Sequence, residues 1–405
     1  MGYTGQVVKS VSWLSGFRIF TRILAFGKTI VLARVLTPVQ FGVFGIASLV
    51  LEFLEMLTET GINIFLIQQK DKFDEFIDSA WFVSILRGIL VGLLIFIGSF
   101  FIADFFKTEA AIGIIQLISV VPVIRGFINP SIVKFQKDLQ FNKEFWFRSS
   151  TFFVDALVAV SLALITKSVY SLAWGMIAGV TLEVILSFLF AKPSPNFIFH
   201  KGYFKKIFHS GKWVTIYGIF NYVAQQGDNI MVGKLLGASP LGIYQMAYKI
   251  STLPISEVTD VVSKVTFPVY SKISGDISRL KKAFIKSTAI VSISTASMGM
   301  VFFLFPEDVI KILLGNNWLS AAPVLQVLSV YGVLRAISGS ASSLFLGVGK
   351  QRYVTIMTFF RFAGLALTIY PLMQAYGMIG AAYSALVSVI IEIPFIVLFI
   401  SKTFK

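Results

Sequence analysis

Long apolar segments recur from one end of this chain to the other, and they constrain its fold more than any other feature. A helix needs about 20 mostly apolar residues to cross the hydrocarbon core of a bilayer. Only 14% of the 405 residues are charged, against about 25% in soluble domains. Hydropathy predicts twelve membrane-spanning helices, at 11–34, 41–66, 79–105, 111–133, 147–166, 170–191, 211–235, 241–271, 284–305, 319–347, 353–374 and 377–400. We therefore predict an all-α polytopic membrane protein.

The segments between these helices are too short to hold a catalytic domain. The chain has no Walker-type phosphate loop, because Gly347–Lys350 lacks the upstream glycine and the hydroxyl that such a loop needs. His200 and His209 lack the partners that a metal site requires, and there is no cysteine. We expect no enzymatic activity, no cofactor and no bound metal.

Basic residues are distributed unevenly between alternate loops. One set of loops contains 21 lysines and arginines, whereas the other set contains only Arg34, Lys107, Lys167, Lys234 and Lys311. Positive charge collects in the cytoplasmic loops of membrane proteins, which accounts for the net charge of +15 without any binding of nucleic acid. The imbalance predicts a multi-pass protein of the plasma (inner) membrane with both termini in the cytoplasm.

The first and seventh predicted helices match each other at an offset of 200 residues. Trp13 aligns with Trp213, and Gly27 aligns with Gly227 in the same ungapped register. An even number of helices in each half gives parallel repeats, related by an axis along the membrane normal. We predict an N-terminal six-helix lobe at 1–200 and a C-terminal six-helix lobe at 201–405, around a central cleft that opens to either side of the membrane.

Several arginines lie inside the predicted helices, where a charge costs about 2.5–3.5 kcal/mol on insertion scales. Guanidinium groups clasp phosphate through two parallel hydrogen bonds, so these arginines predict a cationic chamber for a phosphorylated substrate. An alternative is that they form structural ion pairs, for example Arg18 and Arg22 with Glu55 and Glu59. The predicted substrate residues are Arg18, Arg22, Arg87, Arg125, Arg335 and Arg361, with Asn221 and Gln225.

A second group of intramembrane charges is a candidate for ion coupling or gating. A buried carboxylate can bind and release a proton, although hydrogen bonding between helices is an alternative role. The candidate coupling residues are Asp155, Glu183, Glu257 and Asp260. Lys28 and Asp228 occupy equivalent positions in the two repeats, and we expect them to form a gate contact in one state.

Several segments together resemble a known family of transporters. They are LTPVQFGVFGIA at 36–47, ETGINIFLIQQKD at 59–71, FQKDLQF at 135–141, QGDNIMVGKLLGASPLGIYQMAY at 226–248, FPVYSK at 267–272 and LGNNWLSAAPVLQ at 314–326. The chain resembles the polysaccharide-exporting flippases of the multidrug/oligosaccharidyl-lipid/polysaccharide exporter superfamily. The resemblance is strongest to the branch that includes colanic-acid and teichuronic-acid exporters.

The resemblance implies twelve helices in two lobes and ion-coupled alternating access, driven by H⁺ or Na⁺. It implies a cargo consisting of an oligosaccharide repeat unit linked through pyrophosphate to a polyprenyl lipid, moved from the cytoplasmic to the outer leaflet. Membrane lipids, a polysaccharide polymerase and glycosyltransferases are the expected partners. Two alternatives remain open: a multidrug/cation antiporter of the same superfamily, and a membrane-embedded polymerase or glycosyltransferase.

Overall fold

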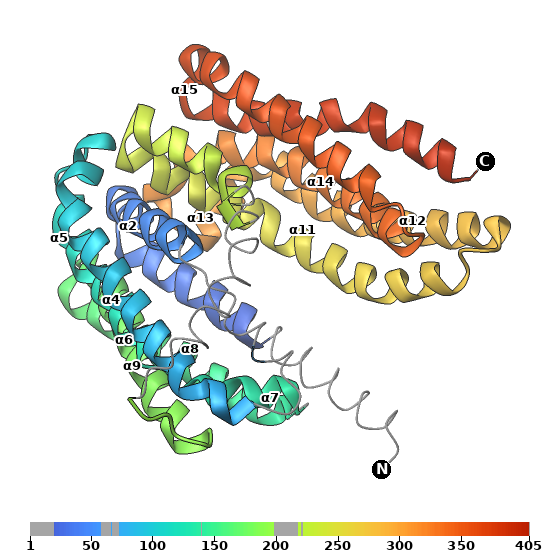
Figure 1. Ribbon diagram of the computed structural model, residues 1–405. Coiled ribbons are helices and arrows are strands. Elements are labelled where there is room, and N and C mark those ends of the chain that lie inside the picture. The colour runs from blue at the N-terminus through green and yellow to red at the C-terminus, as the bar shows by residue number, and fades with distance from the viewer. Residues whose placement is uncertain are drawn as a thin grey trace. The chain divides into compact units, whose positions relative to one another are not determined.

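The computed structural model describes residues 20–57, 66, 73–138, 140–197, 218–219 and 222–404. These residues are mostly helical and contain no β-strand (Figure 1). The chain divides into two compact units: unit 1 comprises Met1–Gly227 with Gly237–Ser239, and unit 2 comprises Asp228–Leu236 with Pro240–Lys405. The division falls within the helical residues 222–236, whereas the repeat predicts 200/201. That the units are repeats of each other stays a prediction.

Unit 1 is a bundle of apolar helices, one of which is interrupted by a bend. Helical residues 20–35 come first. The elements that follow are α2 (Pro38–Leu57), α4 (Phe73–Phe105), α5 (Ala111–Ile118), α6 (Val120–Gly126), η1 (Pro130–Val133), α7 (Lys134–Lys137), α8 (Phe141–Thr166) and α9 (Tyr170–Phe190). Helix α6 packs against α4 and α9, and α8 packs along α9.

The break lies between α6 and η1, where the chain bends by 73°. Asn129 is fully buried there and holds the bend to the end of α9. Its side-chain amide donates hydrogen bonds to the carbonyl oxygens of Ala191 and Pro193, at 3.1 and 3.2 Å, and its side-chain oxygen accepts one from the Ser131 backbone N–H at 2.9 Å. Pro130 follows directly and cannot donate a helical backbone hydrogen bond. The predicted helix at 111–133 is therefore a broken one.

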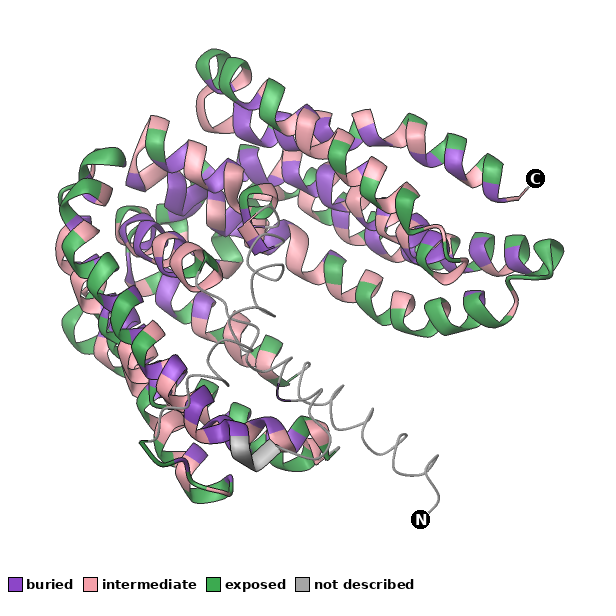
Figure 2. Ribbon diagram, in the orientation of Figure 1, coloured by how far each residue is buried: buried purple, intermediate pink, exposed green. Residues whose placement is uncertain are grey.

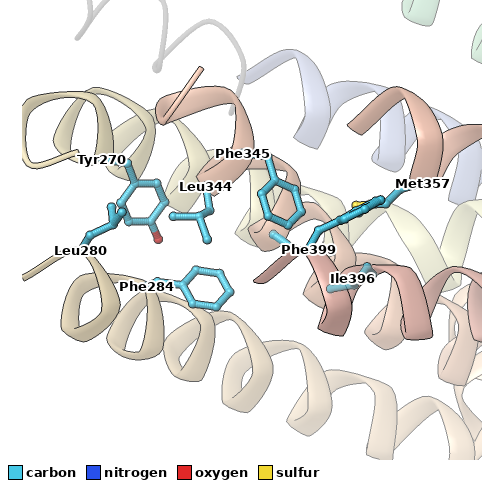
Figure 3. Close-up of a cluster of buried hydrophobic side chains, with 9 residues drawn as sticks. Tyr270, Leu280, Phe284, Leu344, Phe345, Met357, Ile396 and Phe399 are labelled. Carbon is cyan, nitrogen blue, oxygen red and sulfur yellow. The ribbon is translucent and has the colours of Figure 1, made fainter. Parts of the chain in front are cut away.

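Unit 2 consists of longer helices. They are α11 (Ala238–Lys272), α12 (Ile277–Leu304), α13 (Pro306–Leu313), η2 (Asn316–Ala321), α14 (Ala322–Gly347) and α15 (Gln351–Thr403). Helix α14 packs against both α12 and α15. Tyr270 of α11, Phe284 of α12, Phe345 of α14 and Met357 and Phe399 of α15 belong to one buried hydrophobic cluster (Figure 3).

Helix α15 is a hairpin rather than one straight rod. Gly377 has φ 58° and ψ −133°, a backbone conformation that is essentially confined to glycine. The two arms on either side fold back on each other (Figure 1), and the rings of Phe360 and Phe395 stack with centroids 3.8 Å apart. The arms 351–376 and 378–403 correspond to the separate helices predicted at 353–374 and 377–400.

The described helices have the composition and exposure of membrane spans. Seven of them are long and apolar enough to cross a membrane, or eight if the bent segment around residue 127 counts as one. Helix α4 exposes Leu90, Leu94, Ile97 and Phe101, each by 46% or more, and Figure 2 shows mixed exposure along it. A helix that is apolar all round suits a lipid environment. The predicted total of twelve stays a prediction, because 11–34, 41–66 and 211–235 extend beyond the described residues and α11 is not among the seven.

Candidate functional site

Unit 1 encloses a cavity of about 540 Å³. Residues of α2, α4, α6, η1, α8 and α9 line it. The charged residues among them are Glu55, Arg87, Arg125, Arg148, Asp155 and Glu183. Four of these six, Arg87, Arg125, Asp155 and Glu183, are among the site residues predicted from the sequence.

Close helix packing brings these side chains together. A Cβ atom added at Gly88 would collide with the Pro122 carbonyl oxygen, and one at Gly126 would lie 2.8 Å from the Ser84 carbonyl oxygen, so α4 and α6 are in backbone contact. Small residues allow helix backbones in membranes to approach in this way. The same contact places Arg87 of α4 and Arg125 of α6 on the wall of one cavity.

Glu55 of α2 binds both of these arginines. Its carboxylate accepts a hydrogen bond from Nη1 of Arg125 at 2.5 Å. Its backbone carbonyl oxygen accepts one from Nη2 of Arg87 at 2.7 Å. The structure pairs the Glu55 carboxylate with Arg125, and the pairing of Glu55 with Arg22 that the sequence offered stays a prediction.

Asp155 of α8 pairs with Lys28 of the first described helix. Both carboxylate oxygens lie 2.7 Å from Nζ of Lys28. We predicted a gate contact between Lys28 and Asp228, but Asp228 accepts a hydrogen bond from the Tyr244 hydroxyl at 2.9 Å. Each residue thus has a partner within its own unit, and the gate contact stays a prediction.

Arg148 of α8 was missed by the sequence analysis, which counted it among the cytoplasmic loop charges. Its Nε donates to the Glu144 carboxylate at 2.9 Å, and Glu144 also accepts from the Gln136 side chain at 2.6 Å. The spacing of Arg148, Thr151 and Asp155 places all three on one helix face, which is the signal that identifies Arg148 as a cavity residue.

Arg125 and Arg148 retain hydrogen-bond donors that nothing uses in the part of the chain that is described. Arg125 donates only through Nη1, and Arg148 donates only through Nε. Their side chains are 42% and 44% exposed, and both line the cavity. Two guanidinium groups with unused donors are suited to an oxyanion.

The lining of this cavity is balanced in charge rather than cationic. The lining residues include three arginines and three carboxylates. The predicted cationic chamber combined arginines of both lobes and stays a prediction, whereas in this cavity of unit 1 the arginines lie beside carboxylates. An anionic ligand must therefore compete with carboxylates that are already present.

The predicted site residues of unit 2 form a separate network. Arg361 of α15 donates to Glu392 of the same hairpin at 3.3 Å, and Arg335 of α14 lies close enough to act electrostatically on both. Tyr331 and Tyr248 contact each other through their hydroxyls at 3.4 Å. Arg361 is thus the arginine that is bonded to Glu392 in the described part of this unit.

The other predicted residues are not among the described residues that line the cavity of unit 1. Arg22, Gln225 and Asp260 are exposed, and Glu257 is half-buried. Arg18 and Asn221 lie outside the described residues. Among the described residues no group of three or more His, Cys, Asp or Glu side chains is placed to hold a metal ion.

Comparison with known proteins identifies the family. Residues 31–323 match the family described as polysaccharide biosynthesis protein. The teichuronic acid biosynthesis protein TuaB of Bacillus subtilis is 23% identical over 361 residues, covering 86% of this chain and 72% of TuaB. The lipopolysaccharide biosynthesis protein WzxC of Escherichia coli is 23% identical over 363 residues, with the same coverage of 86% and 72%.

A solved structure supports the fold. The lipid II flippase MurJ in an inward closed conformation aligns with a TM-score of 0.75 and 16% identity, over 96% of this chain and 88% of MurJ. The chain belongs to the polysaccharide biosynthesis protein family.

Proposed function

We propose that this protein is a flippase that moves a polyprenyl-pyrophosphate-linked oligosaccharide repeat unit from the cytoplasmic to the outer leaflet, for surface polysaccharide biosynthesis. The observation that carries the proposal is the pair of guanidinium groups, Arg125 and Arg148, whose free donors line the cavity of unit 1. In a polysaccharide exporter, the anionic linkage of the carrier lipid is the chemistry that such donors fit.

The size of the cavity defines which part of the cargo it can hold. Sites for small molecules occupy roughly 300–1,000 Å³, and this cavity has about 540 Å³. It therefore accommodates the pyrophosphate and the first sugar, and the remaining sugars and the polyprenyl chain must lie elsewhere. Arg22, Arg335 and Arg361 stay candidates for contacts with those parts.

The transport cycle that we propose is ion-coupled alternating access with both termini in the cytoplasm. The coupling ion is H⁺ or Na⁺, and its candidate sites are the acids of the cavity, Asp155 and Glu183, together with Glu257 and Asp260 of α11. Glycosyltransferases supply the lipid-linked substrate on the cytoplasmic side, and a polymerase consumes it on the other side.

The proposal is tested by reconstituting the purified protein into vesicles with a fluorescent polyprenyl diphosphate sugar in the inner leaflet. Wild-type protein should expose the label to an external quencher. Arg125→Gln and Arg148→Gln should each slow this exposure by roughly tenfold or more, because a charge-assisted hydrogen bond contributes about 1.5–3 kcal/mol. Arg352→Gln is the matched control, since Arg352 is an exposed cation of unit 2 that does not line the cavity.

Failure of the wild-type protein to translocate this probe overturns the proposal, and so does equal activity of all three variants. The three carboxylates of the cavity favour a second candidate function, transport of a cationic drug. Against it, Glu55 and Asp155 are already paired with basic side chains. Uptake of a cationic dye by the same vesicles, with no movement of the diphosphate lipid, would establish the second function instead.

A further inference from the structure

Glu183 differs from the other two acids of the unit 1 cavity. It lies in the middle of α9 and lines the cavity with Glu55 and Asp155. Glu55 is paired with Arg125, and Asp155 is paired with Lys28. Among the described residues, nothing forms a hydrogen bond or an ion pair with the Glu183 carboxylate. The charges that act on this carboxylate are therefore those of other residues that line the cavity.

Those charges are the same ones that the proposed function assigns to the cargo. Arg125 of α6 and Arg148 of α8 lie close enough to Glu183 to attract its carboxylate, and Glu55 of α2 lies close enough to repel it. Arg125 and Arg148 are also the two arginines with unused donors toward the cavity. Glu183 is thus an anion of the same cavity wall that acts on both arginines without being bonded to either in the described structure.

Helix packing keeps Glu183 at this position. Gly179, one turn earlier in α9, lies directly against α8, where an added Cβ atom would sit 2.9 Å from Cβ of Asp155 and 3.2 Å from the Thr151 carbonyl oxygen. Residues four apart share one face of a helix. The contact at Gly179 therefore directs Glu183 to the face of α9 that meets α8, which carries Arg148.

We infer that Glu183 competes with the cargo inside the protein. In the empty cavity its carboxylate is attracted by Arg125 and Arg148, and the diphosphate of the lipid carrier displaces it. The inference rests on the proposed function and adds a residue that sets the affinity for the diphosphate lipid and the rate at which this lipid is released. It also explains why the lining is neutral in charge although the cargo is an anion.

A competing carboxylate serves a transporter for a simple physical reason. A binding site must be favourable enough for the cargo to enter and weak enough for the cargo to leave. Arg125 and Arg148 are each paired with one carboxylate, Glu55 and Glu144, and their unused donors in a low-dielectric cavity would still hold a diphosphate tightly. A carboxylate that returns to the arginines as the cargo leaves offsets part of that attraction, so it weakens binding and speeds release.

The test measures the affinity of the purified protein for geranylgeranyl diphosphate, a short polyprenyl diphosphate. Glu183→Gln keeps the shape of the side chain and removes its charge. We expect it to bind the probe about tenfold more tightly than wild type and to translocate the fluorescent substrate more slowly. Asp104→Asn is the matched control, because it removes one negative charge at an exposed position outside the cavity and should change neither value.

Two further probes identify what is recognised. Geranylgeraniol carries the same chain without phosphate, and its affinity should be equal for wild type and Glu183→Gln. Inorganic pyrophosphate should compete with the diphosphate lipid, and more effectively in the variant. Should Glu183→Gln not fold, Glu183→Asp withdraws the carboxylate by one methylene and should shift the affinity in the same direction by a smaller factor.

Unchanged or weaker binding of geranylgeranyl diphosphate by a folded Glu183 variant overturns the inference. If wild-type protein still translocates the fluorescent substrate, the proposed function survives that result. If wild-type protein neither binds the diphosphate nor moves the substrate, the proposed function is wrong, and the inference that rests on it is wrong as well. Tighter binding that also appears for geranylgeraniol counts against charge competition.

Discussion

The sequence and the structure give Lys28 two different acidic partners. Variants in which the charges of a pair are exchanged distinguish the two. The structure pairs Lys28 with Asp155, 127 positions away in the chain. The sequence repeat predicts a contact with Asp228 in another state. Reversing the charges in Lys28→Asp/Asp155→Lys should restore a protein that each single change destabilises, because the same two groups then attract in the opposite order.

The expected size follows from the burial of the pair. The side chains of Lys28 and Asp155 are 16% and 20% exposed. Breaking a fully buried pair costs about 3–5 kcal/mol, and a lone charge at the centre of a membrane helix costs about 2.5–3.5 kcal/mol. Because this pair is partly exposed, we expect each single change to lower the free energy of unfolding by about 2–3 kcal/mol, and the double exchange to recover at least half of the summed loss.

The measurement is thermal unfolding of purified protein in detergent, for wild type, both single variants and the double variant. The matched comparison is Lys28→Asp/Asp228→Lys in the same assay and in the transport assay. Additive losses in the Asp155 exchange would show that the 2.7 Å contact contributes nothing, and the reasoning would be refuted. Rescue of transport by the Asp228 exchange would support the gate contact. Absence of rescue would show that this contact is wrong.

Three further changes test helix packing and backbone geometry in the two units. Asn129→Ala removes three hydrogen bonds at the bend, two of them buried, and should lower the stability of the protein by about 2–3 kcal/mol, seen as a lower midpoint in thermal unfolding followed by size-exclusion chromatography. Gly179→Val forces α9 away from Asp155 and should weaken binding of geranylgeranyl diphosphate by tenfold or more; Gly27→Val, where an added Cβ atom meets nothing within 4 Å, should leave binding unchanged. Gly377→Ala imposes a strained backbone at the tip of α15 and should cost about 1–3 kcal/mol, measured as a shift in the midpoint of heat-induced aggregation.

The positions of many membrane-spanning helices could be predicted because the hydrocarbon core of the bilayer constrains the local sequence directly. A helix that crosses hydrocarbon needs about 20 mostly apolar residues whatever packs beside it, so the segments that became α4, α8, α9, α12 and α14 were visible in hydropathy alone. The break at Asn129 was not visible, because a buried amide that bonds to carbonyls more than 60 residues away has no local signature. Pro130 was the only hint of it.

The partners of the intramembrane charges could not be predicted. Sequence spacing shows which residues share one face of a helix, but not which side chains meet across two helices. Arg87, Arg125, Asp155 and Glu183 were selected as charges inside predicted helices, and the structure places all four on one cavity wall. Arg148 was missed, because a cation at the end of a predicted helix has the same sequence pattern as one in a cytoplasmic loop.

By itself the sequence determined the membrane class, the helical architecture and the family, since all three depend on composition and motifs within single segments. Only the tertiary structure decided that Glu55 meets Arg125, that Lys28 meets Asp155 and that the cavity is neutral. The physical reason is that an ion pair between helices depends on their packing and relative rotation. Contacts far apart in the chain, such as the one at Gly88, set both of these.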